Sequence, residues 1–520
     1  MSQEMEGLFS QATYGELFAR AMARNGDRLA LTDGETSLTY AELGDAIGAV
    51  AQFLAGIGLK PGDGLAQLSA NKIEAVIVIG AAFLAGLRYT PLHPLGAADD
   101  HLYILDDANI ACLVVDEERF AERARDLKAR SASVLNIFSH GSSAFPRLPD
   151  WRVVRMSGGF APRGRAEEIA LIAYTGGTTG KPKGVIHRHR SLIANLFTAM
   201  AEWEWPADPR FLAVTPISHA AFLFMLPVFL KGGLFAVRPT FVPGDFAQFV
   251  KAWRISTTFL VPTMIYKLLD SADFADGDLS SLETVIYGAA PISPSRLEQA
   301  MARFGPVFSQ LYGQTEAPNA ISMLFKRDHL PVVEGRLSSC GVPIGDSIVS
   351  LRSEESEVPA GEIGELCVRG PLVMDGYWKK PDETAEALRG GWLHTGDMAI
   401  MNEAGFITLV DRKKDLIISG GFNIYPREVE EALSSHPAVK ECCVVGAPDE
   451  KWGESVVAVV VSRTEADQEQ LIQHVKSRKG VLIAPKRIVF VEALPMTSLG
   501  KIDRKAVREQ FWTSIERRIN

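Results

Sequence analysis

The sequence has no excess of basic residues and no apolar run long enough to form a membrane helix. Of its 520 residues, 54 are Lys or Arg and 63 are Asp or Glu, which gives a net charge of -9. A nucleic-acid-binding protein normally has a basic excess, so this class is excluded. The longest uncharged apolar run, residues 75–87, is shorter than the roughly 20 residues that cross a bilayer. We therefore expect no integral membrane contact.

Cysteine is scarce, and its spacing supports neither a disulfide framework nor a zinc site. The cysteines are odd in number and form no C-x-x-C pair: Cys112, Cys340, Cys367, Cys442 and Cys443. The N-terminal segment MSQEMEGLFSQ lacks the basic and apolar regions of a signal peptide. These features predict a cytoplasmic, reducing location.

The chain is too long for one ordinary domain, and its composition is that of a globular protein. Strand-like runs at 211–216, 257–262 and 283–288 alternate with helical patterns at 221–230, 263–269 and 294–304. This alternation predicts an α/β fold with buried, mostly parallel strands. Residues 73–87 predict a buried helix. The polar segment from about 120 to 165 is interpreted as irregular connecting structure.

The pattern changes near residue 360. A strand is expected at 365–370, followed by a hairpin over 398–412 that turns at 402–405. After residue 412 the sequence predicts a small α+β unit, with helices at 426–434 and 468–478 and strands at 440–446 and 454–461. We expect a domain boundary at about 411–415.

A glycine-rich loop, AYTGGTTGKPKG at 173–184, is the strongest local signal. It follows an apolar strand, and its glycines allow tight turns that present backbone N–H groups to an anion. Three threonine hydroxyls and two lysines add donors and positive charge, as a triphosphate requires. A Walker P-loop needs G-x-x-x-x-G-K-[ST]. Here Thr175 replaces the first glycine and Pro182 replaces the magnesium-binding hydroxyl, so the Walker pattern fails.

This loop resembles the phosphate-binding signature of the adenylate-forming superfamily, which contains acyl-CoA synthetases, aryl-CoA ligases and luciferases. Further motifs follow in that family's order over roughly residues 170–505. The resemblance implies a large N-terminal domain (1–410) with doubly wound sheets and a β-barrel-like part. A hinge (411–415) and a small, mobile α+β C-terminal domain (416–520) follow it.

The resemblance also assigns the contacts to ATP and Mg²⁺. Segment 287–291 (YGAAP) lines the adenine pocket, and segment 312–316 (YGQTE) supplies an adenine-stacking ring, an α-phosphate donor and a magnesium-binding carboxylate. Asp397 accepts hydrogen bonds from the ribose hydroxyls, and Arg412 also reaches the ribose. The residues assigned to ATP are Thr175, Gly176, Gly177, Thr178, Thr179, Gly180, Lys181, Gly288, Ala289, Ala290, Tyr312, Gly313, Gln314, Thr315, Asp397 and Arg412, with Glu316 and Thr175 on the metal.

The acid pocket is expected around segment 215–223 (TPISHAAFL). There His219 stands where the family places a residue beside the reactive carboxylate. The surrounding residues are apolar, which fits a hydrophobic monocarboxylic acid. An aromatic or arylalkanoic acid is favoured, with a fatty acid next. The residues assigned to the acid are His219, Ala220, Phe224, Tyr287, Gly288 and Ala317.

In the C-terminal part, the resemblance makes Lys414 the hinge residue. It places Gly420, Gly421 and Trp452 along the coenzyme A tunnel and makes Lys486 a contact of the CoA nucleotide. Lys501, in PMTSLGKIDRK at 495–505, is the catalytic lysine. Attack of a carboxylate on a phosphate brings two anions together, and a positioned ammonium offsets that repulsion.

These expectations define an AMP-forming acid–thiol ligase that uses ATP, Mg²⁺ and coenzyme A. The alternatives are an acyl-AMP ligase or luciferase-like enzyme that does not use CoA and, more remotely, a non-catalytic nucleotide-binding protein. Amino-acid activation ranks low, because residues 217–226 contain no carboxylate for a substrate ammonium. A homodimer is one assembly compatible with the sequence.

Overall fold

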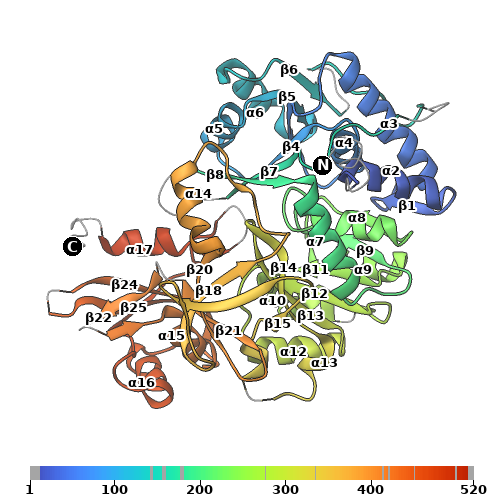
Figure 1. Cartoon of the computed structure of the whole chain (residues 1–520). Helices are drawn as coiled ribbons and strands as arrows, with labels where there is room; N and C mark the ends of the chain where they lie inside the picture. Colours follow the sequence, from blue (N-terminus) through green and yellow to red (C-terminus); the bar gives the residue numbers. More distant parts are fainter. Residues whose placement is uncertain are drawn as a thin grey trace.

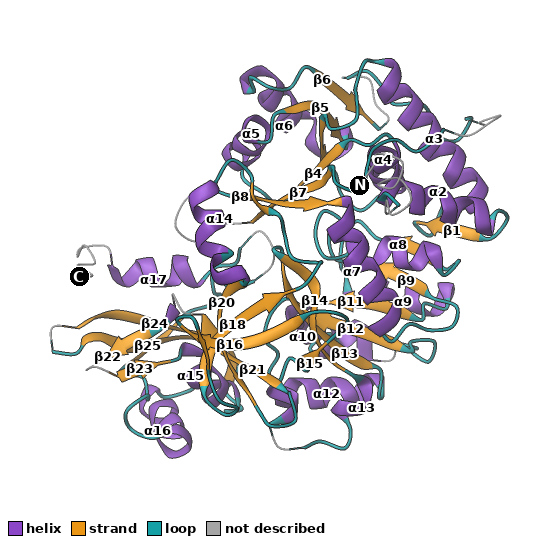
Figure 2. Cartoon of the chain, in the orientation of Figure 1, coloured by secondary structure: helices purple, strands orange, loops and turns teal. Residues whose placement is uncertain are grey.

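Two sheets with parallel cores form most of the large N-terminal domain, and a small domain follows it (Figures 1 and 2). The computed structural model describes residues 12–140, 145–154, 160–175, 181–275, 277–333, 335–412, 415–419, 422–449, 451–497 and 501–512. Among these residues, no helix has both the length and the apolar character needed to span a membrane.

The first sheet has nine strands in the order β15-β14-β13-β12-β11-β9-β10-β1-β2. Its inner strands pair in parallel, and antiparallel pairs close both edges. The strands are β1 (Leu29–Thr32), β2 (Ser37–Thr39), β9 (Arg210–Ala213), β10 (Leu234–Val237), β11 (Thr257–Leu260), β12 (Thr284–Gly288), β13 (Phe308–Gln314), β14 (Ala317–Leu324) and β15 (Val342–Pro343).

The second sheet has seven strands in the order β19-β8-β7-β4-β3-β5-β6 and is parallel from β7 to β6. The pairs β7–β8 and β8–β19 are antiparallel. The strands are β3 (Gly64–Leu68), β4 (Arg88–Leu92), β5 (Ile110–Val115), β6 (Asn136–Ser139), β7 (Ile169–Thr175), β8 (Lys183–Arg188) and β19 (Gly376–Tyr377).

One apolar core fills the space between these two sheets. It combines side chains of both sheets with those of five helices, among them α8, whose sequence FLFMLPVFL has no polar face. A helix that is apolar all round must be covered on all sides. The five helices are α2 (Tyr14–Asn25), α3 (Tyr40–Gly56), α4 (Ile73–Leu84), α7 (His189–Glu202) and α8 (Phe222–Leu230).

Two further cores cover the outer faces of the sheets. Against the first sheet lie α9 (Pro243–Trp253), α10 (Pro262–Leu269), α11 (Ala272–Ala275), α12 (Pro294–Phe304), α13 (Lys326–His329) and the short helix η1 (Arg336–Ser338). Against the second lie α5 (Ala98–Asp107) and α6 (Glu117–Arg130). The helices therefore alternate with the sheets in layers (Figure 2).

The strands and helices expected between residues 168 and 304 are confirmed to within a few residues. The interpretation of residues 120–165 as irregular is wrong in part. Helix α6 runs to Arg130, and β6 adds an edge strand beside β5. The helix is strongly charged, and apolar residues such as Ala124 and Leu127 are buried on its inner side. So few apolar positions give little periodicity in the sequence.

The expected barrel-like part is a five-stranded antiparallel sheet in the order β17-β16-β18-β20-β21. Its strands are β16 (Ile348–Ser353), β17 (Ser356–Glu357), β18 (Ile363–Arg369), β20 (Leu393–Met401) and β21 (Ile407–Arg412), with α14 (Pro381–Ala387) and η2 (Arg389–Gly391) between β18 and β20. The predicted hairpin turn is confirmed, because Gly405 N donates to Asn402 O at 2.9 Å.

The small domain is built on a five-stranded sheet with helices packed against it. Its strands are β22 (Ile417–Ser419), β23 (Phe422–Ile424), β24 (Val439–Asp449), β25 (Gly453–Ser462) and β26 (Arg487–Phe490). Its helices are α15 (Pro426–Ser434), α16 (Gln468–Lys479) and α17 (Arg504–Trp512). It contacts the large domain at β21, where Arg427 Nη1 donates to Leu409 O at 2.8 Å and Arg427 N donates to Asp411 Oδ2 at 2.9 Å.

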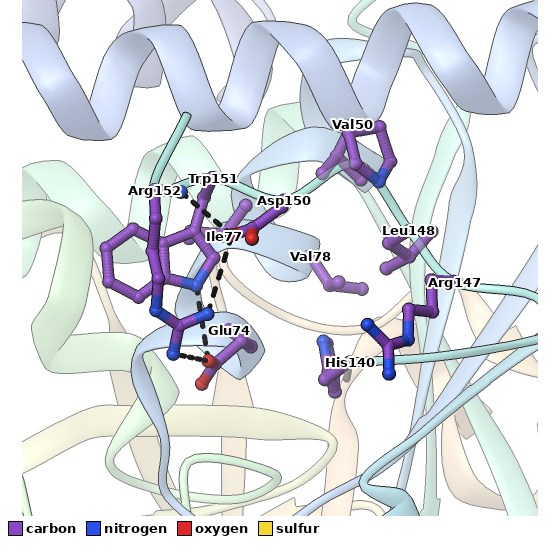
Figure 3. Close-up of a pocket in the computed structure, with 11 residues that line it drawn as sticks. Val50, Glu74, Ile77, Val78, His140, Arg147, Leu148, Asp150, Trp151 and Arg152 are labelled. Atoms are coloured by element: carbon purple, nitrogen blue, oxygen red, sulfur yellow. Dashed lines mark hydrogen bonds and ion pairs between the residues drawn. The ribbon is translucent and has the colours of Figure 1, made fainter. Parts of the chain in front are cut away.

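A cavity opens between α3, α4 and the segment 147–152 (Figure 3). Glu74 and Trp151 lie at one side of it, joined by a 3.2 Å hydrogen bond from the indole nitrogen. No residue that the sequence assigns to ATP, acid or CoA lines this cavity. The site must therefore be sought where those residues meet.

Candidate active site

Asp397 is the centre of a hydrogen-bonded group that joins the nine-stranded sheet to the five-stranded antiparallel sheet. Tyr312 of β13 donates its hydroxyl to Asp397 Oδ2 at 2.6 Å, and Gln314 Nε2 donates to the same oxygen at 2.8 Å. Arg412 Nε lies 3.2 Å from Oδ1. Asp397 and Arg412 face each other across the β20–β21 hairpin, so the strand register itself fixes this ion pair.

The hydroxyl of Tyr312 is committed to Asp397, and its ring is 8% exposed. Burial, followed by the charge of Asp397, raises its pKa well above the ordinary value. The phenol therefore stays neutral and holds the ring in one orientation. A ring fixed beside a carboxylate suits a nucleoside, whose base stacks while its diol donates.

Close backbone approach accounts for two predicted glycines. A side chain at Gly288 would place its Cβ 2.3 Å from Leu311 O on the neighbouring strand, and one at Gly313 would lie 2.3 Å from Asn319 N. Ala289, which follows Gly288, has a φ of +67°. A non-glycine residue in the left-handed region stores strain, a feature that concentrates at functional sites.

Thr315 and Glu316 follow at the turn between β13 and β14. His187 of β8 donates Nε2–H to Thr315 O at 2.7 Å, since a carbonyl oxygen can only accept. Tyr377 of β19 donates its hydroxyl to Glu316 Oε1 at 2.8 Å. Met374 N donates to Glu316 O at 2.8 Å. The turn is thus held by β8 and β19 of the second sheet and by the segment that precedes β19.

The donor set around Glu316 fits a magnesium ion that is shared with a phosphate chain. The described residues contain no cluster of three or more His, Cys, Asp or Glu side chains able to hold a metal. Mg²⁺ needs no such cluster, because it is commonly bound by one or two carboxylates together with substrate phosphates and water. Glu316, with the hydroxyl of Thr175, would hold it.

The glycine-rich loop joins β7 to β8 as an antiparallel pair, with Thr175 opposite Lys183. Lys183 Nζ lies 5.1 Å from the ring centre of Tyr377, and Lys181 Nζ lies 4.9 Å from that of Tyr103. The end of the loop, at Lys183, therefore lies beside the tyrosine that holds Glu316. Gly176, Gly177, Thr178, Thr179 and Gly180 lie outside the described residues.

His219 lies in the turn between β9 and α8, with Nδ1 3.1 Å from Ser218 Oγ. Burial, followed by His93 and Lys501, lowers its pKa to about 3. The imidazole is therefore neutral near pH 7. Asn71, from the loop before α4, holds this turn by accepting from Ile217 N at 2.9 Å and donating to Thr215 O at 2.9 Å.

Lys501 of the small domain lies near both the Asp397 group and His219. Burial, followed by the charge of Arg412, lowers its pKa to about 8, against a raising influence from Asp397. The same lysine lowers the pKa of His219. Lys501 is therefore close to both the ribose-side group and the acid-side group. Its backbone is fixed by Thr497, which donates to Lys501 O at 2.7 Å and accepts from Lys501 N at 3.2 Å.

Two residues assigned to the acid pocket lie instead in apolar cores. Phe224 is fully buried, with its ring 4.9 Å from Phe211 and 4.6 Å from Trp203. Tyr287 is also fully buried, and its hydroxyl donates to Gln310 Oε1 at 3.1 Å. Neither ring is exposed in this structure, so their contact with the acid stays a prediction. Ala317 is buried, and Ala220 is half-buried next to His219.

The residues assigned to coenzyme A are exposed on the small domain. Trp452 is 41% exposed, with Lys451 Nζ 4.9 Å from its ring centre. Lys486 is exposed, and its backbone N donates to Val456 O at 2.9 Å. The structure does not bring either residue to Asp397 or His219. Gly420, Gly421 and Lys414 lie outside the described residues.

The sequence did not identify four residues that organise this site: Asn71, His93, His187 and Tyr377. Each lies at an end of a strand of the second sheet or in a loop next to it, far in sequence from the motif that it supports. The polar residue that follows a buried strand is the available signal, since the carboxyl ends of parallel strands collect functional side chains. His93 directly after β4 fits that signal.

A mixed α/β large domain, a smaller C-terminal domain and this constellation define an adenylate-forming enzyme. The AMP-binding enzyme family matches residues 18–378, and the AMP-binding enzyme C-terminal domain matches residues 428–501. The chain belongs to the AMP-binding enzyme family, in its acyl-CoA synthetase branch.

Curated relatives and solved structures agree with this placement. The chain is 45% identical to the medium/long-chain-fatty-acid–CoA ligase FadD8 of Mycobacterium tuberculosis, over 99% of this chain and 93% of that protein. It is 37% identical to a feruloyl-CoA synthase of Amycolatopsis, over 93% and 96%. The amide bond synthetase McbA of Marinactinospora thermotolerans superimposes with a TM-score of 0.89 at 33% identity, over 96% of this chain and 99% of that one.

Proposed function

We propose that this protein is an ATP-dependent carboxylate–CoA ligase acting on a hydrophobic monocarboxylic acid. The observation that carries the proposal is the Asp397 carboxylate, which Tyr312, Gln314 and Arg412 hold in place. Lys501 couples this group to His219, because Arg412 lowers the pKa of Lys501 and Lys501 lowers the pKa of His219. These are the groups that the family assigns to the two substrates of the first step, ATP and the acid. A cation between an acid site and a nucleotide site is what adenylate formation requires.

In the first step, a carboxylate oxygen attacks the α-phosphorus of ATP, the bond to the β-phosphate oxygen breaks, and pyrophosphate leaves. Tyr312, Gln314 and Arg412 fix Asp397 so that it can accept from the ribose hydroxyls. Lys501 offsets the repulsion between the two anions. Bound Mg²⁺ would neutralise charge on the phosphates.

In the second step, the thiolate of coenzyme A attacks the acyl carbonyl and the bond to AMP breaks. The residues assigned to CoA, Trp452 and Lys486, are exposed on the small domain, and none of their printed contacts is with the acid group. We therefore propose that the domains 1–410 and 416–520 turn about the hinge 411–415, with Lys414 as the pivot. Closure steps of this kind commonly complete a catalytic site.

The acid is proposed at the level of its chemistry. A neutral His219, the half-buried Ala220 and an absence of carboxylates over 217–226 favour a hydrophobic monocarboxylate. The two rings assigned to the pocket, Phe224 and Tyr287, are buried in this structure and give no support to an aromatic acid in particular. Fatty acids, the class named for the relative at 45% identity, now rank equal with aryl acids.

The decisive test is ATP–pyrophosphate exchange with medium-chain, long-chain, benzoic and cinnamic acids, followed by AMP release with and without CoA. Exchange with at least one acid and AMP release that depends on CoA are expected. Exchange without CoA-dependent turnover would favour an acyl-AMP ligase, and an amine acceptor belongs in the same screen because McbA is an amide bond synthetase. Absence of exchange with every acid would refute the proposal.

We also propose a cytoplasmic location, because a reducing compartment suits five buried cysteines. A homodimer stays a prediction, which sedimentation velocity would test.

A further inference from the structure

We propose that His93 is the positioning residue for His219, and that it fixes the orientation of the His219 ring through an edge-to-face contact. The inference rests on the proposed function for its meaning in catalysis, because His219 is assigned to the acid. The geometry of the contact between the two rings does not depend on the proposed function. His93 follows β4 in the second sheet, whereas His219 follows β9 in the first.

The contact between the two rings is close and perpendicular. Their centroids are 4.6 Å apart, and the ring planes make an angle of 81°. Perpendicular aromatic pairs at this separation are attractive, since the positive edge of one ring meets the negative face of the other. The Ser218 hydroxyl lies at Nδ1 of His219, so two different neighbours restrict the ring.

His93 is itself held at both ends. Its Nδ1 accepts from Leu95 N at 3.1 Å, and its carbonyl oxygen accepts from Gly96 N at 2.8 Å. A nitrogen that accepts from a backbone N–H carries no proton, so in neutral His93 the proton is on Nε2. The ring is 9% exposed, and burial lowers its pKa to about 4.

A second histidine supports the first. His101 Nε2 donates to His93 O at 2.9 Å, and Arg123 Nη1 lies 3.1 Å from His101 Nδ1 and 2.9 Å from Gly96 O. Gly96 is required for this approach, since a Cβ there would lie 2.4 Å from His101 Nε2. The segment from His93 to His101 is thus built to hold one ring in place.

Three groups of the described residues act on the His219 ring: the His93 ring, the Ser218 hydroxyl and the Lys501 ammonium. If His93 excludes water from the His219 ring, removal of His93 should raise the His219 pKa toward its ordinary range. A catalytic contact and a purely structural residue would both lower activity. Only a residue that sets the surroundings of His219 would also change this titration.

The test uses two variants of the full chain, each of which removes a different feature of His93. His93→Asn keeps an acceptor for Leu95 N but removes the ring, whereas His93→Phe keeps a ring but removes the acceptor. Histidine NMR titration follows His219 Cε1–H, assigned with His219→Asn. Rapid-quench measurement of acyl-AMP, with CoA omitted, gives the first-step rate and the KM for ATP. Circular dichroism verifies folding.

In the wild type we expect no titration of His219 above about pH 5. In His93→Asn we expect its pKa to rise by about one unit or more and the first-step rate to fall about 3- to 10-fold at an unchanged KM for ATP. His93→Phe should stay closer to the wild type in both measurements.

Titration of wild-type His219 near pH 6.5 would overturn the inference without any variant. So would a His93→Asn protein with unchanged His219 pKa, or equal losses in both variants. Because the titration needs no substrate, it also separates failure of this inference from failure of the proposed ligase activity, which would leave the NMR result standing.

Discussion

Lys501 should give the first step an alkaline limit that can be measured. Burial and Arg412 lower its pKa from 10.5 to about 8. At that pKa about nine in ten of the side chains carry a proton at pH 7, but only about one in ten at pH 9. If the ammonium is the acting form, the first-step kcat/KM should fall about tenfold over this range.

The assay is acyl-AMP formation by rapid quench, with CoA omitted so that ionisation of its thiol cannot contribute. The kcat/KM for ATP reports the free enzyme, which is the state that the structure describes. Lys501→Arg is the matched control, because a guanidinium keeps its proton throughout this range. Its activity will be lower, but the alkaline limit near pH 8 should be absent.

The titration of Lys501 does not itself destabilise the folded state at alkaline pH. The folded state binds fewer protons at Lys501 than the unfolded chain between about pH 8 and pH 10.5, so the contribution of this lysine to stability rises with pH there. A wild-type rate that is flat to about pH 9.5, or the same limit in Lys501→Arg, would refute the reasoning.

Four further substitutions test individual parts of the site. Lys501→Ala should lower the rate of acyl-AMP formation about 100-fold or more but largely spare thioester formation from synthetic acyl-AMP. An equal loss in the two rates would count against a role for Lys501 in the first step. Asp397→Asn removes the anion that Arg412 and the ribose share, so the KM for ATP should rise about 10- to 100-fold at little change in melting temperature; an unchanged KM contradicts the ribose assignment. Tyr377→Phe removes one hydrogen bond from Glu316 and should raise the Mg²⁺ concentration for half-maximal rate about 3- to 10-fold, with no such change if Glu316 is not a metal ligand. Lys414→Pro should slow thioester formation more than acyl-AMP formation, and equal rates would place the hinge elsewhere.

The sequence was most informative where the local chain encodes the contact. The 398–412 pattern predicted a hairpin, and the register of that hairpin alone brings Asp397 opposite Arg412. The alternation of strands and helices over 168–304 likewise predicted the parallel core of the first sheet. In the hairpin, neighbours in sequence are also neighbours in space.

Contacts between residues that are far apart in the chain could not be predicted from the sequence. A strand buried on both faces does not reveal which side chain faces a ligand, and Tyr287 turned toward the outer core of its sheet. Phe224 lies on a helix with no polar face, so no periodicity distinguishes a lining position from a packed one. His93 and Asn71 reach the 215–219 turn only because the two sheets stack, which no local pattern encodes.

The balance of charges at the site links the two halves of the proposed cycle. The acid side has a neutral His219 and His93 and no carboxylate over 217–226, so the substrate carboxylate meets little repulsion from the protein and one cation, Lys501. Partial burial opposes the charge of that cation and lowers its pKa. The triphosphate supplies the negative charge that stabilises it. Once pyrophosphate has left, most of that charge is gone, and the ammonium gains by returning to water. The desolvation of Lys501 would then supply the free energy that releases the small domain after the first step.

A variant whose side chain has no charge to desolvate, Lys501→Met, should therefore stay longer in the present orientation after adenylate formation. Distance measurements between labels on the two domains, with bound acyl-AMP, would detect the difference, and identical distance distributions in wild type and variant would contradict this argument.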